Sequence, residues 1–261
     1  MIGRRKVIGW GVLGLVSAFT LSSLGSSQSQ KSTVLVISAA ASLQDVLQEI
    51  GDIYRQHTPH IQLTYNFGAS GSLRYQIEQG APVDIYISAA QRYMDALQSQ
   101  DLLLPGTRKD LLKNEMVLIT AKRNTDISGF TQLKSDRVQK IAIGAPESVP
   151  AGAYAKEVLD TLHLYQALES KFVFAKDVRQ VLTYVETGNV DAGMVYRTDA
   201  KISDRVKIIE IAPDDSHSPI VYPVAIIRES KNPEAAQEFV QFLFSPPAQK
   251  IFQKYGFMNR G

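Results

Sequence analysis

Small residues and hydroxyl groups gather at five places in this sequence where a strand-like run ends or a helix-like run begins. These places are residues 38–43, 67–73, 150–153, 176–179 and 193–196. In open α/β sheets, ligands collect beyond the carboxyl ends of the strands. Helix N-termini there offer unpaired N–H groups and a positive dipole end, which favour an anion. Each segment alone is also explained by helix capping, but their recurrence in both halves of the chain predicts a shared anion site.

A different chemistry is suggested by Gly68-Ala-Ser-Gly-Ser72, which nearly matches the nucleophile elbow Gly-x-Ser-x-Gly of serine hydrolases. Ser70, an aspartate and His217 occur in the right chain order for a triad. However, Ser72 replaces the last glycine of the motif, and no oxyanion loop of the His-Gly-Gly type is present. We therefore expect a binding protein without catalytic residues and keep the hydrolase as an alternative.

Other common site motifs are missing from the sequence. The chain has no cysteine, which excludes a disulfide framework, a thiolate zinc site and a cysteine nucleophile. It also lacks a His-Glu-x-x-His motif, a Walker loop and a dinucleotide fingerprint. We therefore predict no cofactor and no bare metal cation.

The elements that must position the site alternate between strands and helices from Thr33 onward, which predicts an α/β fold. The segment Ile77–Ile87 resembles Val185–Val195, and each combines a helix end, a Gly stop, Val-Asp and a buried strand. This echo suggests two similar lobes, one from residues 31–120 and 222–261 and the other from 121–221. The expected strands are Val34–Ile37, Ile61–Phe67, Asp84–Ile87, Met116–Thr120, Ile141–Ile143, Phe172–Phe174, Ala192–Val195 and Val221–Ile227.

The N-terminal thirty residues have the succession of a signal peptide. Arg4, Arg5 and Lys6 precede an apolar run from Val7 to Phe19, and small and polar residues follow. The glycine-broken run is short for a membrane anchor, which is the alternative. These residues contribute +3 to a formal net charge of +2, so the rest of the chain is nearly neutral. We expect export to the periplasm and no nucleic-acid partner.

An ordered set of motifs resembles the periplasmic molybdate-binding (ModA) family of ABC importers, within the type II periplasmic binding protein superfamily. The resemblance covers nearly all of residues 33–257. It rests on Ala39-Ala-Ala-Ser-Leu43, Phe67-Gly-Ala-Ser-Gly-Ser-Leu73, Gly80-Ala-Pro-Val-Asp-Ile-Tyr-Ile-Ser-Ala89, Pro150-Ala-Gly-Ala-Tyr-Ala-Lys-Glu157, Asp177-Val-Arg179, Gly193-Met-Val-Tyr196, Tyr222-Pro-Val224 and Ile251-Phe-Gln-Lys-Tyr-Gly-Phe257. It implies two α/β lobes joined by two chain crossings, with a ligand cleft between them.

The resemblance also implies a site for molybdate or tungstate without a lysine or arginine counter-charge. Carried over by position, the ligand-binding residues are Ser42, Ser70, Ala151, Val178 and Tyr196. Ser42 and Ser70 would donate hydroxyl and backbone N–H groups, Ala151 and Val178 backbone N–H groups, and Tyr196 its phenol. All but Tyr196 stand at predicted helix starts, Ser42 as an N-cap. The implied partner is the membrane permease of an ABC importer, and we expect a monomer. A binding protein for sulfate or another oxyanion is the alternative.

Overall fold

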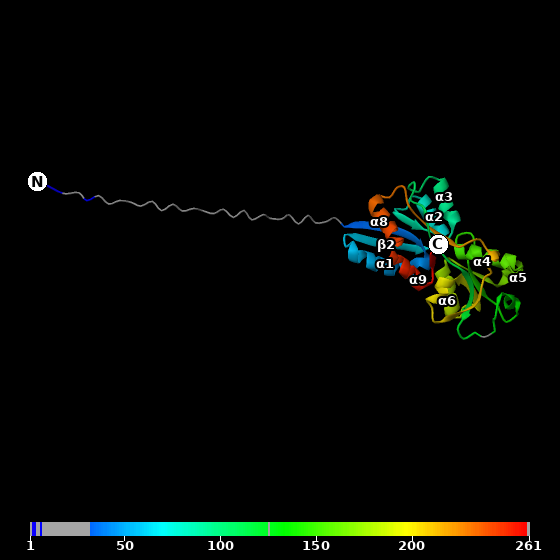
Figure 1. Ribbon diagram of the computed structural model, residues 1–261. Coiled ribbons are helices and arrows are strands. Elements are labelled where there is room, and N and C mark those ends of the chain that lie inside the picture. Colours follow the sequence, from blue (N-terminus) through cyan, green and yellow to red (C-terminus); the bar gives the residue numbers. More distant parts are fainter. Residues whose placement is uncertain (1, 4–5, 7–31, 125, 260–261) are drawn as a thin grey trace. The chain divides into compact units, whose positions relative to one another are not determined.

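The computed structural model describes residues 2–3, 6, 32–124 and 126–259 (Figure 1). Ser32–Gly261 forms a compact unit of its own. Nearly all of the expected signal peptide lies outside the described residues. None of the described helices combines the length and apolar character that a membrane crossing requires.

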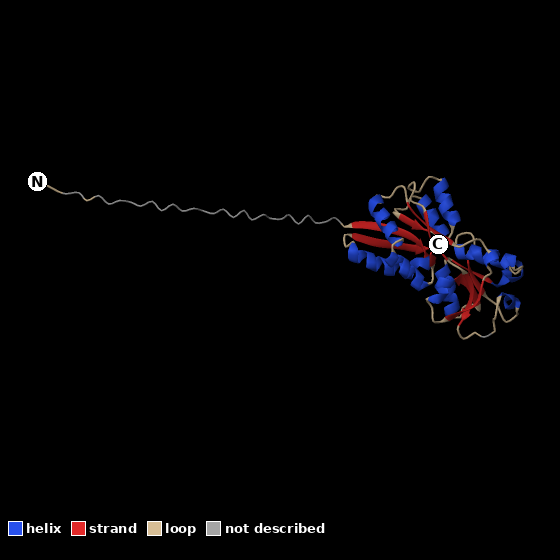
Figure 2. Ribbon diagram, viewed as in Figure 1, coloured by secondary structure: helices blue, strands red, loops and turns tan. Residues whose placement is uncertain are grey.

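The strands of the compact unit form two separate sheets flanked by helices (Figure 2). The first sheet has six strands in the order β11-β4-β10-β3-β1-β2. Its strands are β1 (Thr33–Ala40), β2 (Ile61–Gly68), β3 (Ile85–Ile87), β4 (Lys109–Lys113), β10 (Val221–Ile226) and β11 (Met258–Asn259). β1 runs parallel to both β2 and β3, whereas β10 is antiparallel to β3 and β4. The helices of this part are α1 (Gln44–His57), α2 (Ser70–Glu78), α3 (Gln91–Ser99), α8 (Pro233–Leu243) and α9 (Pro246–Tyr255).

The second sheet has five strands in the order β7-β6-β8-β5-β9. Its strands are β5 (Met116–Ala121), β6 (Ile141–Gly144), β7 (Phe172–Ala175), β8 (Ala192–Tyr196) and β9 (Val206–Ile211), and its helices are α4 (Pro150–Thr161), α5 (Tyr165–Leu168), α6 (Val178–Glu186) and α7 (Arg197–Lys201). β6 is parallel to β7 and β8, and β5 is antiparallel to β8 and β9. The α/β fold with two similar halves is confirmed.

The point where the chain leaves the first sheet differs from the expectation. Met116–Ala121 pairs with β8 and β9 of the five-stranded sheet, although residues up to 120 were expected in the first lobe. The chain therefore passes between the sheets across Asn114 and Glu115. The expected boundary at residue 121 instead coincides with the end of β5, within the second sheet. The return falls between β9 and β10, close to the expected residue 222.

Local sequence explains the helices that position the site. In α6 the apolar residues Val178, Val181, Leu182 and Val185 are all buried, as their spacing predicts. The first turn of α4 lies against the end of β6, because Gly152 and Gly144 meet there. A Cβ on Gly152 would lie 1.9 Å from the Gly144 carbonyl oxygen, so only glycine permits this approach. The close approach of these two glycines thus allows the first turn of α4 to pack against the end of β6.

Candidate anion-binding site

A narrow cleft brings together the loop that follows β1, the starts of α2, α4 and α6, and the end of β8. It encloses an empty volume of about 200 Å³, part of it open to solvent. All five residues expected from the sequence line it. The complete lining is Ala40, Ala41, Ser42, Gly68, Ala69, Ser70, Ala89, Val149, Pro150, Ala151, Asp177, Val178 and Tyr196.

Ser70 is the first residue of α2 and is completely buried. Its Oγ accepts a hydrogen bond from the Ala89 N–H at 3.0 Å. The hydroxyl hydrogen therefore remains available for a ligand, because a hydroxyl can accept and donate at the same time. The Tyr86 hydroxyl donates to the Ser70 carbonyl oxygen at 2.7 Å, which fixes the backbone of this residue.

Ser42 lies in a 3₁₀ turn, Ala41–Leu43, and is not the N-cap that the sequence predicted, because α1 starts two residues later. Its Oγ lies 2.9 Å from the Tyr222 hydroxyl. Asn114 Nδ2 donates to that same phenol at 3.2 Å and to Thr198 Oγ1 at 2.9 Å. The phenol can accept from Asn114 and at the same time donate its own hydrogen to Ser42 Oγ. In that arrangement the Ser42 hydroxyl hydrogen is free to donate to a ligand.

The second sheet supplies two helix N-termini to the cleft. Ala151 is the second residue of α4, and Val178 is the first residue of α6. N–H groups at these positions have no acceptor inside their own helix, and none is found for either among residues 32–124 and 126–259. The N-cap residue Asp177 uses its carboxylate to accept from the Gln180 N–H at 2.9 Å. Both helices therefore present free donors.

Tyr196 ends β8 and is 1% exposed. Its hydroxyl has no hydrogen-bond partner among the described residues, a rare condition for a buried polar group. Burial raises the pKa of the Tyr196 phenol well above its ordinary value, so the group stays protonated. The Tyr196 hydroxyl is therefore a donor without an acceptor, as expected where a ligand atom accepts the hydrogen bond.

Asp177 is the one charged residue among the described residues that line the cleft. No lysine or arginine is among the described residues that line it. Arg179, next to Val178, forms ion pairs with Asp45 of α1 and with Asp199, the latter at 2.9 Å. Burial raises the pKa of Asp199 to about 6, against the opposing effect of the Arg179 guanidinium. The arginine is thus committed to carboxylates, in agreement with its expected role outside the ligand set.

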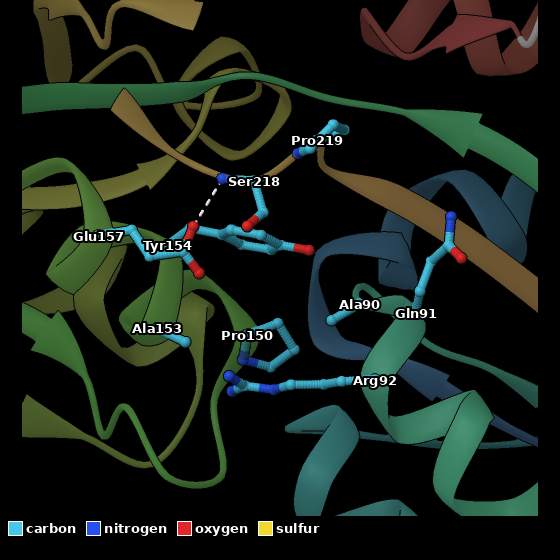
Figure 3. A pocket seen from close by; sticks show the side chains of 9 residues that line it. All are labelled: Ala90, Gln91, Arg92, Pro150, Ala153, Tyr154, Glu157, Ser218 and Pro219. Atoms are coloured by element: carbon cyan, nitrogen blue, oxygen red, sulfur yellow. Dashed lines mark hydrogen bonds between the residues drawn. The ribbon is translucent and has the colours of Figure 1, made fainter. Parts of the chain in front are cut away.

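The geometry does not support the hydrolase alternative. The Ser70 hydroxyl is bonded to a backbone N–H, whereas His217 Nδ1 lies 2.8 Å from the Ser218 carbonyl oxygen and its ring packs against Tyr154. A second pocket, of about 660 Å³ including space open to solvent, shares Pro150 with the cleft. The side chains that line it are drawn in Figure 3 and include both Arg92 and Glu157, so an arginine and a glutamate face this pocket.

Sequence reasoning missed the residues that orient the donors. Tyr222 lies in a motif that was cited only for its resemblance to the family, and Asn114 was not identified as a site residue. Asn114 and Tyr222 are separated by 108 positions in the chain. The only signal for Asn114 was a polar residue next to a chain crossing, and that crossing was expected after residue 120.

The comparisons with known proteins agree with this site. A family model described as bacterial extracellular solute-binding protein matches residues 35–258. The chain belongs to this family. It is 46% identical to a protein named as the ABC transporter substrate-binding lipoprotein YvgL of Bacillus subtilis, over 93% of both chains. It is 36% identical to the molybdate-binding protein ModA of Haemophilus influenzae, over 92% of this chain and 96% of that one.

A solved structure supports the same assignment for this solute-binding protein. The periplasmic molybdate-binding protein of Azotobacter vinelandii superposes with a TM-score of 0.80 at 25% identity. The match covers 87% of this chain and 100% of the other. The family and the two-sheet architecture that the sequence motifs implied are therefore confirmed.

Proposed function

We propose that this solute-binding protein captures molybdate or tungstate through Ser42, Ser70, Ala151, Val178 and Tyr196 and delivers the anion to the membrane permease of an ABC importer. The observation that carries the proposal is the buried Tyr196 hydroxyl, a protonated donor without an acceptor. Around it stand free hydroxyl hydrogens and free helix N–H groups. The names of the ModA relatives support the choice of ligand.

The donor set selects for an oxyanion that carries no hydrogen. Phosphate near neutral pH retains a proton that needs an acceptor, whereas the five proposed positions offer donors. The Asp177 carboxylate, the one acid among the described lining residues, accepts from the Gln180 N–H through Oδ1. Hydrogen bonds to a charged group contribute roughly 1.5–3 kcal/mol each. Five donor positions are enough for micromolar to nanomolar binding, about 8–12 kcal/mol, after the cost of association.

The remaining parts of the proposal concern the chain around the site. The two sheets correspond to two lobes, residues 32–113 with 221–261 and residues 116–211, joined by two crossings. The chain is exported with removal of its N-terminal segment, acts as a monomer and uses no cofactor. It catalyses no reaction, so Ser70 should not react with a fluorophosphonate probe.

Calorimetric titration of residues 32–261 with molybdate, tungstate, sulfate and phosphate tests the ligand. We expect saturable binding at one site for molybdate and tungstate, and no heat of binding for phosphate. Tighter binding of sulfate would assign the cleft to that anion instead. Preference for phosphate, or no binding of any of the four, would contradict the proposal.

A further inference from the structure

Three consecutive carbonyl groups of the loop between β6 and α4 accept hydrogen bonds from helices of the other sheet. Arg92 Nη2 donates to the Pro146 carbonyl oxygen at 3.1 Å. The Tyr93 hydroxyl donates to that of Glu147 at 2.9 Å. The Gly71 N–H donates to that of Ser148 at 2.9 Å. Gly71 belongs to α2, and Arg92 and Tyr93 belong to α3.

The two side chains of this set support each other. Arg92 Nη2 also donates to the Tyr93 hydroxyl at 2.7 Å, so that hydroxyl must use its own hydrogen for Glu147. The Arg92 guanidinium lies 4.7 Å from the centre of the Tyr93 ring, at cation–π distance. Tyr93 is 6% exposed, so its hydrogen bonds are largely shielded from water. Figure 3 shows the Arg92 side chain extending beneath Pro150 of α4.

The two parts approach each other closely at Gly71. A Cβ at this position would lie 2.6 Å from the Ser148 carbonyl oxygen and 2.9 Å from its Cα. Both are backbone atoms, which cannot rotate away. The Gly71 N–H lies in the first turn of α2, where no acceptor exists within the helix. The Ser148 carbonyl supplies that acceptor only while the two parts are in contact.

These contacts are made by the segments that carry the anion donors. Gly71 follows Ser70 directly, and Ser148 comes three residues before Ala151. The loop is itself rigid, because the N–H groups of Ser148 and Val149 both bond to the Ala145 carbonyl oxygen. A shift at the Gly71–Ser148 contact must therefore move the Ser70 and Ala151 donors apart.

We propose that Gly71, Arg92 and Tyr93 form a latch on the Pro146–Ser148 loop that holds the two halves of the cleft closed. They act as positioning residues that set how long a bound oxyanion stays, and this part rests on the proposed function. The Asp45–Arg179 ion pair also joins helices of the two sheets and is untouched by changes in the latch. Loss of the latch should therefore alter closure without unfolding the chain.

The ligand-independent test measures closure directly. The natural chain has no cysteine, so spin labels can be placed uniquely at the exposed positions Gln79 and Glu169. In the absence of any anion, Gly71→Ala should increase the share of longer distances relative to the unsubstituted chain. Ser72→Ala, an exposed neighbour in the same helix, is the matched control for the added helix propensity. Coincident distributions for all three proteins would overturn the latch.

The second test separates release from capture by stopped-flow measurement with molybdate. Tyr93→Phe removes the hydrogen bond to the Glu147 carbonyl oxygen and the one accepted from Arg92. It should raise the dissociation rate constant about five- to tenfold, with the association rate constant within about twofold. Gly71→Ala should raise the dissociation rate constant at least as much. Tyr75→Phe, which alters a 58% exposed tyrosine, is the control.

The melting temperature distinguishes a latch from a merely structural role. Gly71→Ala removes a contact between the two parts and adds a residue that favours the helix, so the latch predicts only a small change in the ligand-free melting temperature. A fall in melting temperature with unchanged dissociation would overturn it. Failure of the unsubstituted protein to bind any oxyanion would refute the proposed function, while the spin-label distances still decide the latch.

Discussion

Tyr196→Phe should change ligand-free stability and ligand affinity in opposite directions, because the deleted hydroxyl is buried without a partner. A buried polar group that makes no hydrogen bond carries an uncompensated desolvation cost of about 1–3 kcal/mol. Deleting the Tyr196 hydroxyl removes that cost. We therefore expect the ligand-free variant to be as stable as the unsubstituted chain, or more stable by about 1 kcal/mol.

In the bound state the same hydroxyl would donate to a charged oxygen. Loss of one such bond costs roughly 1.5–3 kcal/mol, which corresponds to a rise in Kd of about ten- to 150-fold. Urea unfolding without ligand and calorimetric titration with molybdate measure the two quantities on the same preparation.

Tyr222→Phe is the matched comparison, since it deletes a phenol of equal burial that does have partners. Its hydroxyl interacts with Ser42 and Asn114, so its loss should lower ligand-free stability by about 1–3 kcal/mol. The reasoning is refuted if Tyr196→Phe binds molybdate as tightly as the unsubstituted chain. It is equally refuted if Tyr196→Phe destabilises the ligand-free protein as much as Tyr222→Phe does.

Three further substitutions and one mass measurement have defined outcomes. Ser70→Asp should abolish molybdate binding in calorimetry with the fold intact by circular dichroism, because it sets a negative charge against a dianion. Burial raises the pKa of Asp199 from 3.8 to about 6, so this group's contribution to stability is full below pH 3.8 and is lost as pH rises through 6; Asp199→Asn should remove that slope from urea unfolding curves taken across this range. Gly152→Ala should lower the free energy of unfolding by about 1–3 kcal/mol, because its Cβ would lie 1.9 Å from the Gly144 carbonyl oxygen. Mass spectrometry of the exported protein should find an N-terminus between Leu21 and Lys31, and an intact N-terminus on cytoplasmic protein would contradict export.

The parts of the fold that sequence predicts well are those with strong local periodicity. The buried face of α6 is an example, and the hydrophobic runs of β1 and β8 are others. The strands β4 and β9 were missed because charged residues interrupt them and only part of each is buried.

In the candidate site, too, sequence predicts the local features and misses the long-range ones. Its donors follow from local features, since helix starts and strand ends can be recognised in a short window of sequence. The orientation of those donors cannot be recognised in this way. Ser42 depends on Tyr222, which lies 180 positions away, and Tyr222 depends in turn on Asn114. Such a relay exists only once both sheets have formed.

The absence of lysine and arginine from the described lining of the cleft has a consequence for how salt affects capture. A cage of dipoles acts over a short range, because the influence of a helix terminus fades within its first turn. Dissolved ions screen exposed charges over a Debye length of about 8 Å at physiological ionic strength. They find no cation to screen among the described residues of the lining, so binding should depend only weakly on ionic strength. The lining itself likewise lacks a cation that would attract the anion over a long range. Selectivity among oxyanions should then appear mainly in how slowly the right anion leaves.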